Sequence, residues 1–179
     1  MDYKIATDMN AASMVDFKAL EIIRGDIWRY GTGFQIIAAD TNYATVNFTT
    51  PATGFVFYSP TNISKTGFEA TISLIEGGTY VSTGSSVLTG LNLNRSDTDP
   101  VPFGAVRFGL SPAGTTITGG VSFPEDLLPG ASGGNSRLGG ALSSNTPIAL
   151  KPATNYTLKI LARGGVVNFA ASIDLIWNL

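Results

Sequence analysis

Apolar and polar residues alternate most regularly near the C-terminal end of the chain. Between residues 167 and 177 every odd position is apolar, and the even positions are mostly polar or small. Residues 156–161 repeat the pattern, with Tyr156, Leu158 and Ile160 at the apolar positions. A period of two places successive side chains on opposite faces of a strand, so each segment predicts a strand with one buried face. Gly164 and Gly165 lie between the two segments and predict the turn that joins them.

The middle of the chain contains further short segments of this kind, separated by Gly, Pro and Asn turn residues. Predicted strands cover residues 34–38, 43–49, 54–59, 68–76, 87–94 and 102–110. Turns are predicted at residues 40–42 and, of hairpin type, at Gly77 and Gly78. Eight to ten short strands without intervening helices predict an all-β protein, an antiparallel, jelly-roll-like β-sandwich formed by residues 34–179.

Residues 1–33 have a different pattern and predict an N-terminal arm or short helix. Phe17, Leu20, Ile23 and Ile27 follow one another at helical spacings, although Gly25 interrupts the stripe. An extended arm with two short strands fits the same residues equally well. In both cases Trp28 and Tyr30 need a surface to pack against, so we interpret 1–33 as a docking segment.

Composition excludes several kinds of function. The chain has no histidine and no cysteine, which removes Ser-His-Asp and Cys-His catalysis, disulfides and a typical zinc site. Charged residues make up 13% of the chain, the net charge is −2, and the lysines and arginines are scattered. Nucleic-acid binding needs a clustered positive surface and is not expected. Low charge with 44% hydrophobic residues favours a protein that hides much of its surface in an assembly.

The distribution of apolar residues indicates neither a signal peptide nor a membrane-spanning segment. The first residues lack the apolar core of a signal peptide, and no run of about 20 apolar residues occurs. We therefore expect synthesis in the cytoplasm without export.

The stretch PGASGGNSRLGGALS, residues 129–143, resembles a phosphate-binding loop only in its glycines. It contains no lysine, and the strand before it and the helix after it that such a loop requires are missing. We expect no cofactor here. Residues 119–147 are interpreted as a long connection that reaches a neighbouring subunit, with Arg137 as a candidate contact.

Two other groups of residues leave alternatives open. Asp97 with Asp99, and Glu125 with Asp126, are interpreted as turn residues, with a carboxylate hydrolase or a calcium site as the alternatives. Phe34, Phe55, Phe57 and Tyr58 are either sheet core or the lining of a carbohydrate groove.

Three motifs, in order, resemble a virion structural protein of tailed bacteriophages over roughly residues 34–179. The motifs are Leu74, Ile75, Glu76, Gly77 and Thr79, then Asn92, Asn94 and Arg95, then Leu150, Pro152, Thr154, Tyr156 and Leu158. Ile75 stands where the family often has tyrosine.

The resemblance implies a non-enzymatic structural component of the particle, located on the head or at the tail. Of these we expect a capsid decoration or cement protein or a head fibre. With it we expect a homotrimer that binds the major capsid protein or other virion proteins. A carbohydrate- or receptor-binding module of a tail fibre or spike is the alternative.

Overall fold

The protein is all-β and antiparallel, as predicted. The computed structural model describes residues 24–81, 85–96, 101–112, 116–124, 126–130, 138–140 and 148–178. The strands in these ranges are β1 (Ile27–Ile37), β2 (Tyr43–Thr49), β3 (Phe55–Glu76), β4 (Thr79–Val81), β5 (Ser86–Val87), β6 (Leu91–Asn92), β7 (Arg107–Leu110), β8 (Thr116–Thr118), β9 (Val121–Ser122), β10 (Asp126–Leu128), β11 (Leu138–Gly140), β12 (Ile148–Leu150) and β13 (Asn155–Asn178). The described residues contain no helix that is long and apolar enough to span a membrane.

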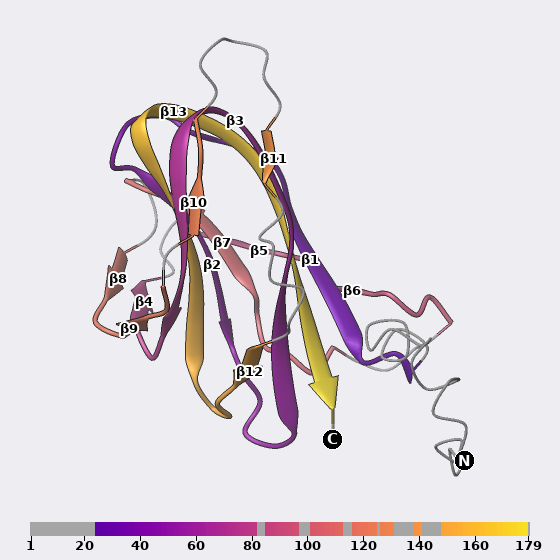
Figure 1. Cartoon of the computed structure of the whole chain (residues 1–179). Coiled ribbons are helices and arrows are strands. Elements are labelled where there is room, and N and C mark those ends of the chain that lie inside the picture. The colour runs from indigo at the N-terminus through magenta and orange to yellow at the C-terminus, as the bar shows by residue number, and fades with distance from the viewer. Residues whose placement is uncertain are drawn as a thin grey trace, which may run out of the picture.

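Two long strands, β3 and β13, form the centre of the molecule. They pair antiparallel along their whole length, from Tyr156 opposite Glu76 to Asn178 opposite Phe55. Figure 1 shows this ribbon rising, arching over at one end and descending again. The prediction of two strands joined by a turn at Gly164 and Gly165 is therefore wrong, because one strand, β13, continues through both glycines.

Glycines allow the ribbon to bend instead of ending. Gly67 and Gly164 have φ values of 93° and 85°, in the left-handed region that residues with a Cβ rarely adopt. A Cβ on Gly67 would lie 2.5 Å from the backbone oxygen of Val166. The predicted turn at 40–42 is confirmed, and its Asp40 carboxylate accepts hydrogen bonds from the amides of Thr41 (2.9 Å) and Gly164 (2.7 Å). The bend is thus fixed by both backbone conformation and hydrogen bonds.

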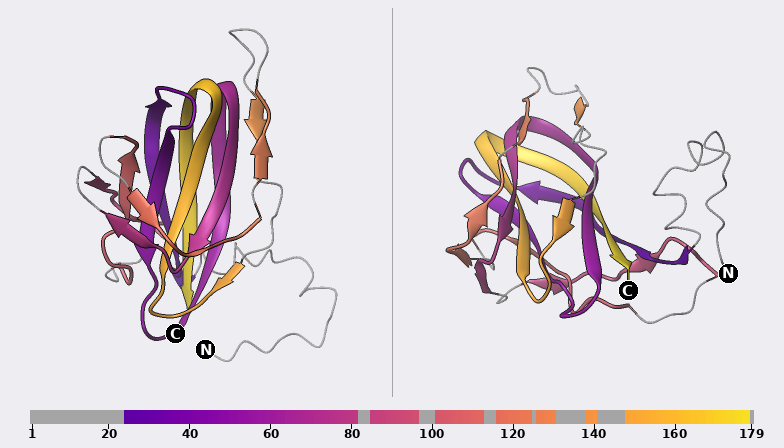
Figure 2. Two further views of the ribbon diagram at one scale, coloured as in Figure 1. Left: turned by 90° about the vertical axis from the view of Figure 1, so that its left-hand side faces the viewer. Right: turned by 60° about the horizontal axis from the view of Figure 1, so that its bottom comes forward.

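Strands β2 and β1 lie end to end along the other edge of β13. β2 pairs with residues 155–161, and β1 pairs with residues 167–176. β7 extends the sheet beyond β2 and is followed by β5, while β6 pairs with β1. Because all these strands follow the bend, the main sheet of the described residues is one curled, eleven-stranded sheet (Figure 2). The all-β class is thus confirmed, whereas a sandwich of two separate sheets is not confirmed in this part of the chain.

The segment interpreted as a long connection covers the outer edge of β3. β9, β10, β11 and β12 pair in chain order with successive parts of β3, from residues 75–76 down to 56–58. The described parts of this segment thus pair with their own chain. Residues 131–137 and 141–147, which include most of the Gly-rich stretch, lie outside the described residues, so a contact with a neighbouring subunit stays a prediction. Short, interrupted edge strands limit uncontrolled pairing between sheets. Arg137 lies outside the described residues.

The turn at Gly77 and Gly78 also has a different role from the one predicted. Strand β3 ends at Glu76 and β4 begins at Thr79, so the chain does turn there. However, β4 pairs with β8 in a separate two-stranded sheet, while the end of β3 pairs with β9. The two strands flanking the glycines therefore do not form a hairpin.

The core lies between the two halves of the curled sheet. Alternating positions predicted to face inward are buried, and they are Ala44, Val46, Phe48, Ala70, Ile72, Leu74, Tyr156, Leu158, Ile160, Val167, Phe169, Ala171, Ile173 and Leu175. The ring of Phe108 on β7 lies 6.5 Å from the ring of Phe169 on the far half of β13. Side chains from the two halves thus meet across the core.

The predicted boundary between residues 33 and 34 falls inside β1 and is corrected here. Ile27, Trp28 and Tyr30 are buried in the folded body, because β1 satisfies its backbone hydrogen bonds by pairing with β13. These three residues are therefore strand residues, as the extended-arm alternative predicted, but they pack within their own chain and are not free to dock on another protein. Phe17, Leu20 and Ile23 lie outside the described residues, and a docking role for them stays a prediction.

Candidate functional site

Four features of the described residues are candidate sites: an ion pair with a buried carboxylate, a polar cluster that includes motif residues, a recess beside Phe34, and exposed apolar side chains near the bend. The ion pair joins Arg29 on β1 to Asp174, its direct partner on β13. Arg29 Nε and Nη2 donate to the two carboxylate oxygens at 2.8 and 3.0 Å, and the Asp174 side chain is 1% exposed. Such a two-point pair is a structural link between strands, because the arginine already neutralises the buried carboxylate.

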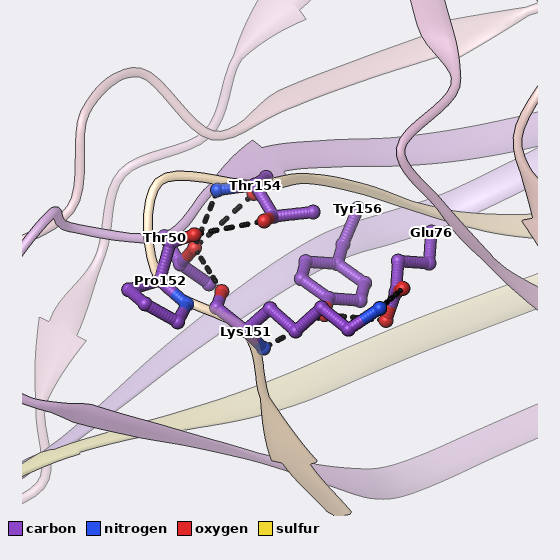
Figure 3. Close-up of polar contacts among 6 residues, drawn as sticks. All are labelled: Thr50, Glu76, Lys151, Pro152, Thr154 and Tyr156. Carbon is purple, nitrogen blue, oxygen red and sulfur yellow. Dashed lines mark hydrogen bonds and ion pairs between the residues drawn. The ribbon is translucent and has the colours of Figure 1, made fainter.

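The polar cluster joins Glu76, Lys151 and Tyr156 (Figure 3). The Tyr156 hydroxyl donates to Glu76 Oε2 at 2.8 Å and accepts a hydrogen bond from the Lys151 amide at 2.9 Å. The Lys151 ammonium binds the other carboxylate oxygen of Glu76. Residues of the first and third motifs thus contact each other in space.

Three further motif residues, Asn92, Asn94 and Thr154, take part in hydrogen bonds at the ends of strands. Thr50 Oγ1 donates to the Lys151 carbonyl at 2.6 Å and accepts from the Thr154 amide at 2.9 Å (Figure 3). In the second motif the Asn92 side chain donates to the Gly25 carbonyl and accepts from the Asn94 amide, both at 2.8 Å. These bonds satisfy backbone groups where strands end. The motifs therefore mark structural joints of the fold.

Hydrogen bonds in the cluster determine the protonation of Glu76. The bond from Lys151, and then that from Tyr156, lower the pKa of Glu76, and burial raises the pKa of Tyr156 to about 12. A carboxylate with a lowered pKa stays ionised at neutral pH and is a poor proton donor. The cluster is thus suited to a structural role.

Acid titration should reveal this link. Because folding lowers the pKa of Glu76, its stabilising effect is complete above the pKa of the unfolded chain and is lost as pH falls through the folded value. We expect the melting temperature of Glu76→Gln to change less than that of the wild type between pH 6 and about pH 3. Thermal melts followed by circular dichroism measure this, with Glu69→Gln as the control. Equal acid sensitivity in Glu76→Gln and the wild type would contradict the assignment.

The predicted carboxylate sites gain no support as reaction centres from the described residues. Asp97, Asp99 and Glu125 lie outside them, and Asp126 is an exposed residue of β10 opposite Ile72. Among the described residues no group of three or more acidic, histidine or cysteine side chains is placed to hold a metal ion.

The four aromatic residues considered for a carbohydrate groove do not lie together. Tyr58 is in the core, so the core interpretation holds for it, and Phe57 is half-buried. Phe34 and Phe55 are 69% and 71% exposed, but Phe34 lies opposite Ala170 whereas Phe55 lies opposite Asn178. The exposed pair thus occupies two separate places on the sheet.

Phe34 lines a recess on the outer face of the sheet. The recess has a volume of about 500 Å³ and is lined by Phe34, Ser64, Lys65, Thr66, Asn168, Phe169 and Ala170. Sequence reasoning missed it because the pairing of β1 shifts between Gly31 and Phe34. This bulge reverses the alternation, so that Trp28 and Tyr30 face the core and Phe34 faces outward.

A second outward-facing feature lies at the bend. Ile36, Phe68 and Val166 are 49%, 54% and 41% exposed, and we call these three residues the bend-end patch. Ile36 is the second-last residue of β1 and lies near the bend. The Phe68 ring of β3 lies against Gly165 of β13, which directly precedes Val166. The predicted interaction residues Ile27, Trp28 and Tyr30 take no part in it. The sequences Gly67-Phe68 and Gly164-Gly165-Val166 were the available sequence signal for this patch, because they place apolar residues directly beside the glycines of the bend.

Comparisons with protein-family models, with curated proteins and with solved structures find no match to this chain.

Proposed function

We propose that this chain is a non-enzymatic structural protein of a tailed-bacteriophage virion that associates with itself and binds the particle surface. The observation that carries the proposal is apolar surface on a chain of low charge. Eleven large apolar side chains among the described residues are between 41% and 71% exposed, and only 13% of all residues are charged. Where exposed apolar side chains lie next to one another, they favour burial against other subunits.

The motif residues support a structural role over a catalytic one. Glu76 and Tyr156 bind each other and Lys151, while the Asn92 amide and the Thr154 hydroxyl donate to backbone carbonyls. Their polar atoms are used within the fold, so the resemblance to virion proteins rests on residues that build the sheet. Such an arrangement is expected of a structural protein, whose polar side chains stabilise its own fold.

The proposed assembly is a homotrimer on the capsid, in the manner of a decoration or cement protein or a head fibre. The bend-end patch is the proposed contact between copies, because it gathers three apolar side chains at one end of a rigid ribbon. Closed oligomers bury such patches repeatedly with one kind of interface. The partner on the particle is then the major capsid protein or another virion protein.

Quantitative mass spectrometry of purified particles tests the virion role. We expect this chain in many copies per particle, in fixed ratio to the major capsid protein and in a multiple of three. Particles complemented with Phe68→Ser/Val166→Ser should carry much less of it than particles complemented with Val87→Ser/Val121→Ser, a control with two other exposed valines. Absence of the chain from purified, infectious particles would refute the proposal.

A further inference from the structure

The recess beside Phe34 has the geometry of a small-ligand site. Strand pairing places Phe34, Ala170 and Ser64 in one row across β1, β13 and β3, since Phe34 lies opposite Ala170 and Ala170 opposite Ser64. The neighbouring row on β13 and β3 contains Asn168 and Thr66. Ala170 lies between Phe34 and Ser64 in this row, and its small side chain leaves space between the Phe34 ring and the Ser64 hydroxyl. A flat molecule can thus lie against the ring of Phe34 with its edge toward Ser64.

The polar side chains of the recess are available to a ligand. The Ser64 and Thr66 hydroxyls and the Asn168 amide make no side-chain hydrogen bond within the part of the chain that the structure describes. Together they offer hydroxyl and amide groups that both donate and accept. A ligand with several hydroxyl groups would satisfy them.

The charged side chains in and near the recess are directed toward the core or are paired with an opposite charge. Lys65 and Phe169 lie opposite each other and both are buried, so their side chains face the core. The Lys65 ammonium donates to the Phe68 carbonyl at 2.8 Å. The Arg29–Asp174 pair further along the same strands is neutral as a unit. The described residues of the recess therefore present no charged side-chain end to a ligand on the outer face of the sheet.

We infer that this recess is a binding site for a neutral saccharide, with one sugar ring stacked on Phe34 and its hydroxyl groups bonded to Ser64, Thr66 and Asn168. An aromatic ring provides a flat apolar surface for the C–H face of a sugar, and hydroxyl and amide side chains match its rim. The inference does not depend on the proposed virion role, because a saccharide site is compatible with any protein that meets a cell surface. It assigns Phe34 and Asn168 to ligand contact, beside Ile36 of the bend-end patch, which lies opposite Asn168.

A glycan array with two printed sets tests the site. One set contains neutral oligosaccharides of glucose, galactose, N-acetylglucosamine and rhamnose, and the other contains sialylated and uronic-acid glycans. The full chain should bind at least one neutral glycan, and Phe34→Ala should weaken that binding about tenfold or more, the size of one lost aromatic contact. Asn168→Ala should weaken it as well. Phe55→Ala is the matched control, because Phe55 is equally exposed but lies outside the recess.

Each outcome of the experiment has a defined meaning. Neutral-glycan binding that is lost in Phe34→Ala and kept in Phe55→Ala supports the site, provided that both variants keep the wild-type melting temperature and molecular mass. Binding to acidic glycans alone, binding that survives Phe34→Ala, or no binding to any printed glycan overturns it. A lower molecular mass for Phe34→Ala overturns it too, by showing that a second copy occupies the recess, whereas failure of the virion proposal would leave glycan binding unchanged.

Discussion

Replacing Phe169 with alanine should lower the free energy of unfolding by about 4 kcal/mol, a large fraction of the stability of a typical domain. Phe169 is buried on the far half of β13, and its ring contacts the ring of Phe108 on β7 from the other half of the sheet. The alanine variant removes the ring and leaves a cavity where the two halves of the curled sheet meet. Urea unfolding followed by tryptophan fluorescence measures the loss.

Phe55→Ala is the control for this experiment. Phe55 belongs to β3 but is 71% exposed, so its removal should change the free energy of unfolding by less than about 0.5 kcal/mol. A loss below about 1 kcal/mol in Phe169→Ala would mean that the two halves do not pack against each other. The curled sheet would then lack its core.

Strand positions and inward-facing residues could be predicted because alternation is a local property. Tyr156, Leu158 and Ile160 face the core as their spacing indicated, and the turn after Asp40 lies where expected. Each of these features depends only on neighbouring residues and on the period of two in a strand. The all-β class followed from the same pattern.

Long-range pairing could not be predicted from the same pattern. Gly164 and Gly165 look like a turn, and only the continuous partner β3, with Gly67 at the bend, makes them a curve within one strand. The glycine-rich region after residue 119 likewise resembles a free connection until its short strands are seen paired with β3. In both cases the sequence gives the flexibility of the backbone but not the partner that determines its path.

The candidate sites were harder to predict than the fold, because one bulge decides which side chains face outward. Trp28 and Tyr30 were interpreted as parts of a docking segment and are buried in the fold of their own chain, whereas Phe34, four residues beyond Tyr30, is exposed. Gly31 and Gly33 on either side of Thr32 were the only local sign of a shift in pairing. Without the register of β13, their effect on Phe34 and Ile36 could not be deduced.

Self-association is the second result with a large expected effect. Ile36, Phe68 and Val166 expose apolar surface near the bend, where the Gly164 amide on β13 donates to the Asp40 carboxylate. Burial against other copies would remove that surface from water. The double variant Phe68→Ser/Val166→Ser should therefore dissociate at concentrations where the wild type stays assembled. The variant Val87→Ser/Val121→Ser should stay assembled, because its two valines lie on β5 and β9, away from the bend.

Sedimentation equilibrium of the full chain at micromolar concentration tests the central claim most directly, since it reports the mass of the particle formed. We predict three times the 18.7 kDa mass of the chain for the wild type, and a single chain for the bend-end double variant with an unchanged circular dichroism spectrum. A wild-type protein that sediments as a single 18.7 kDa chain over the whole concentration range would contradict the account.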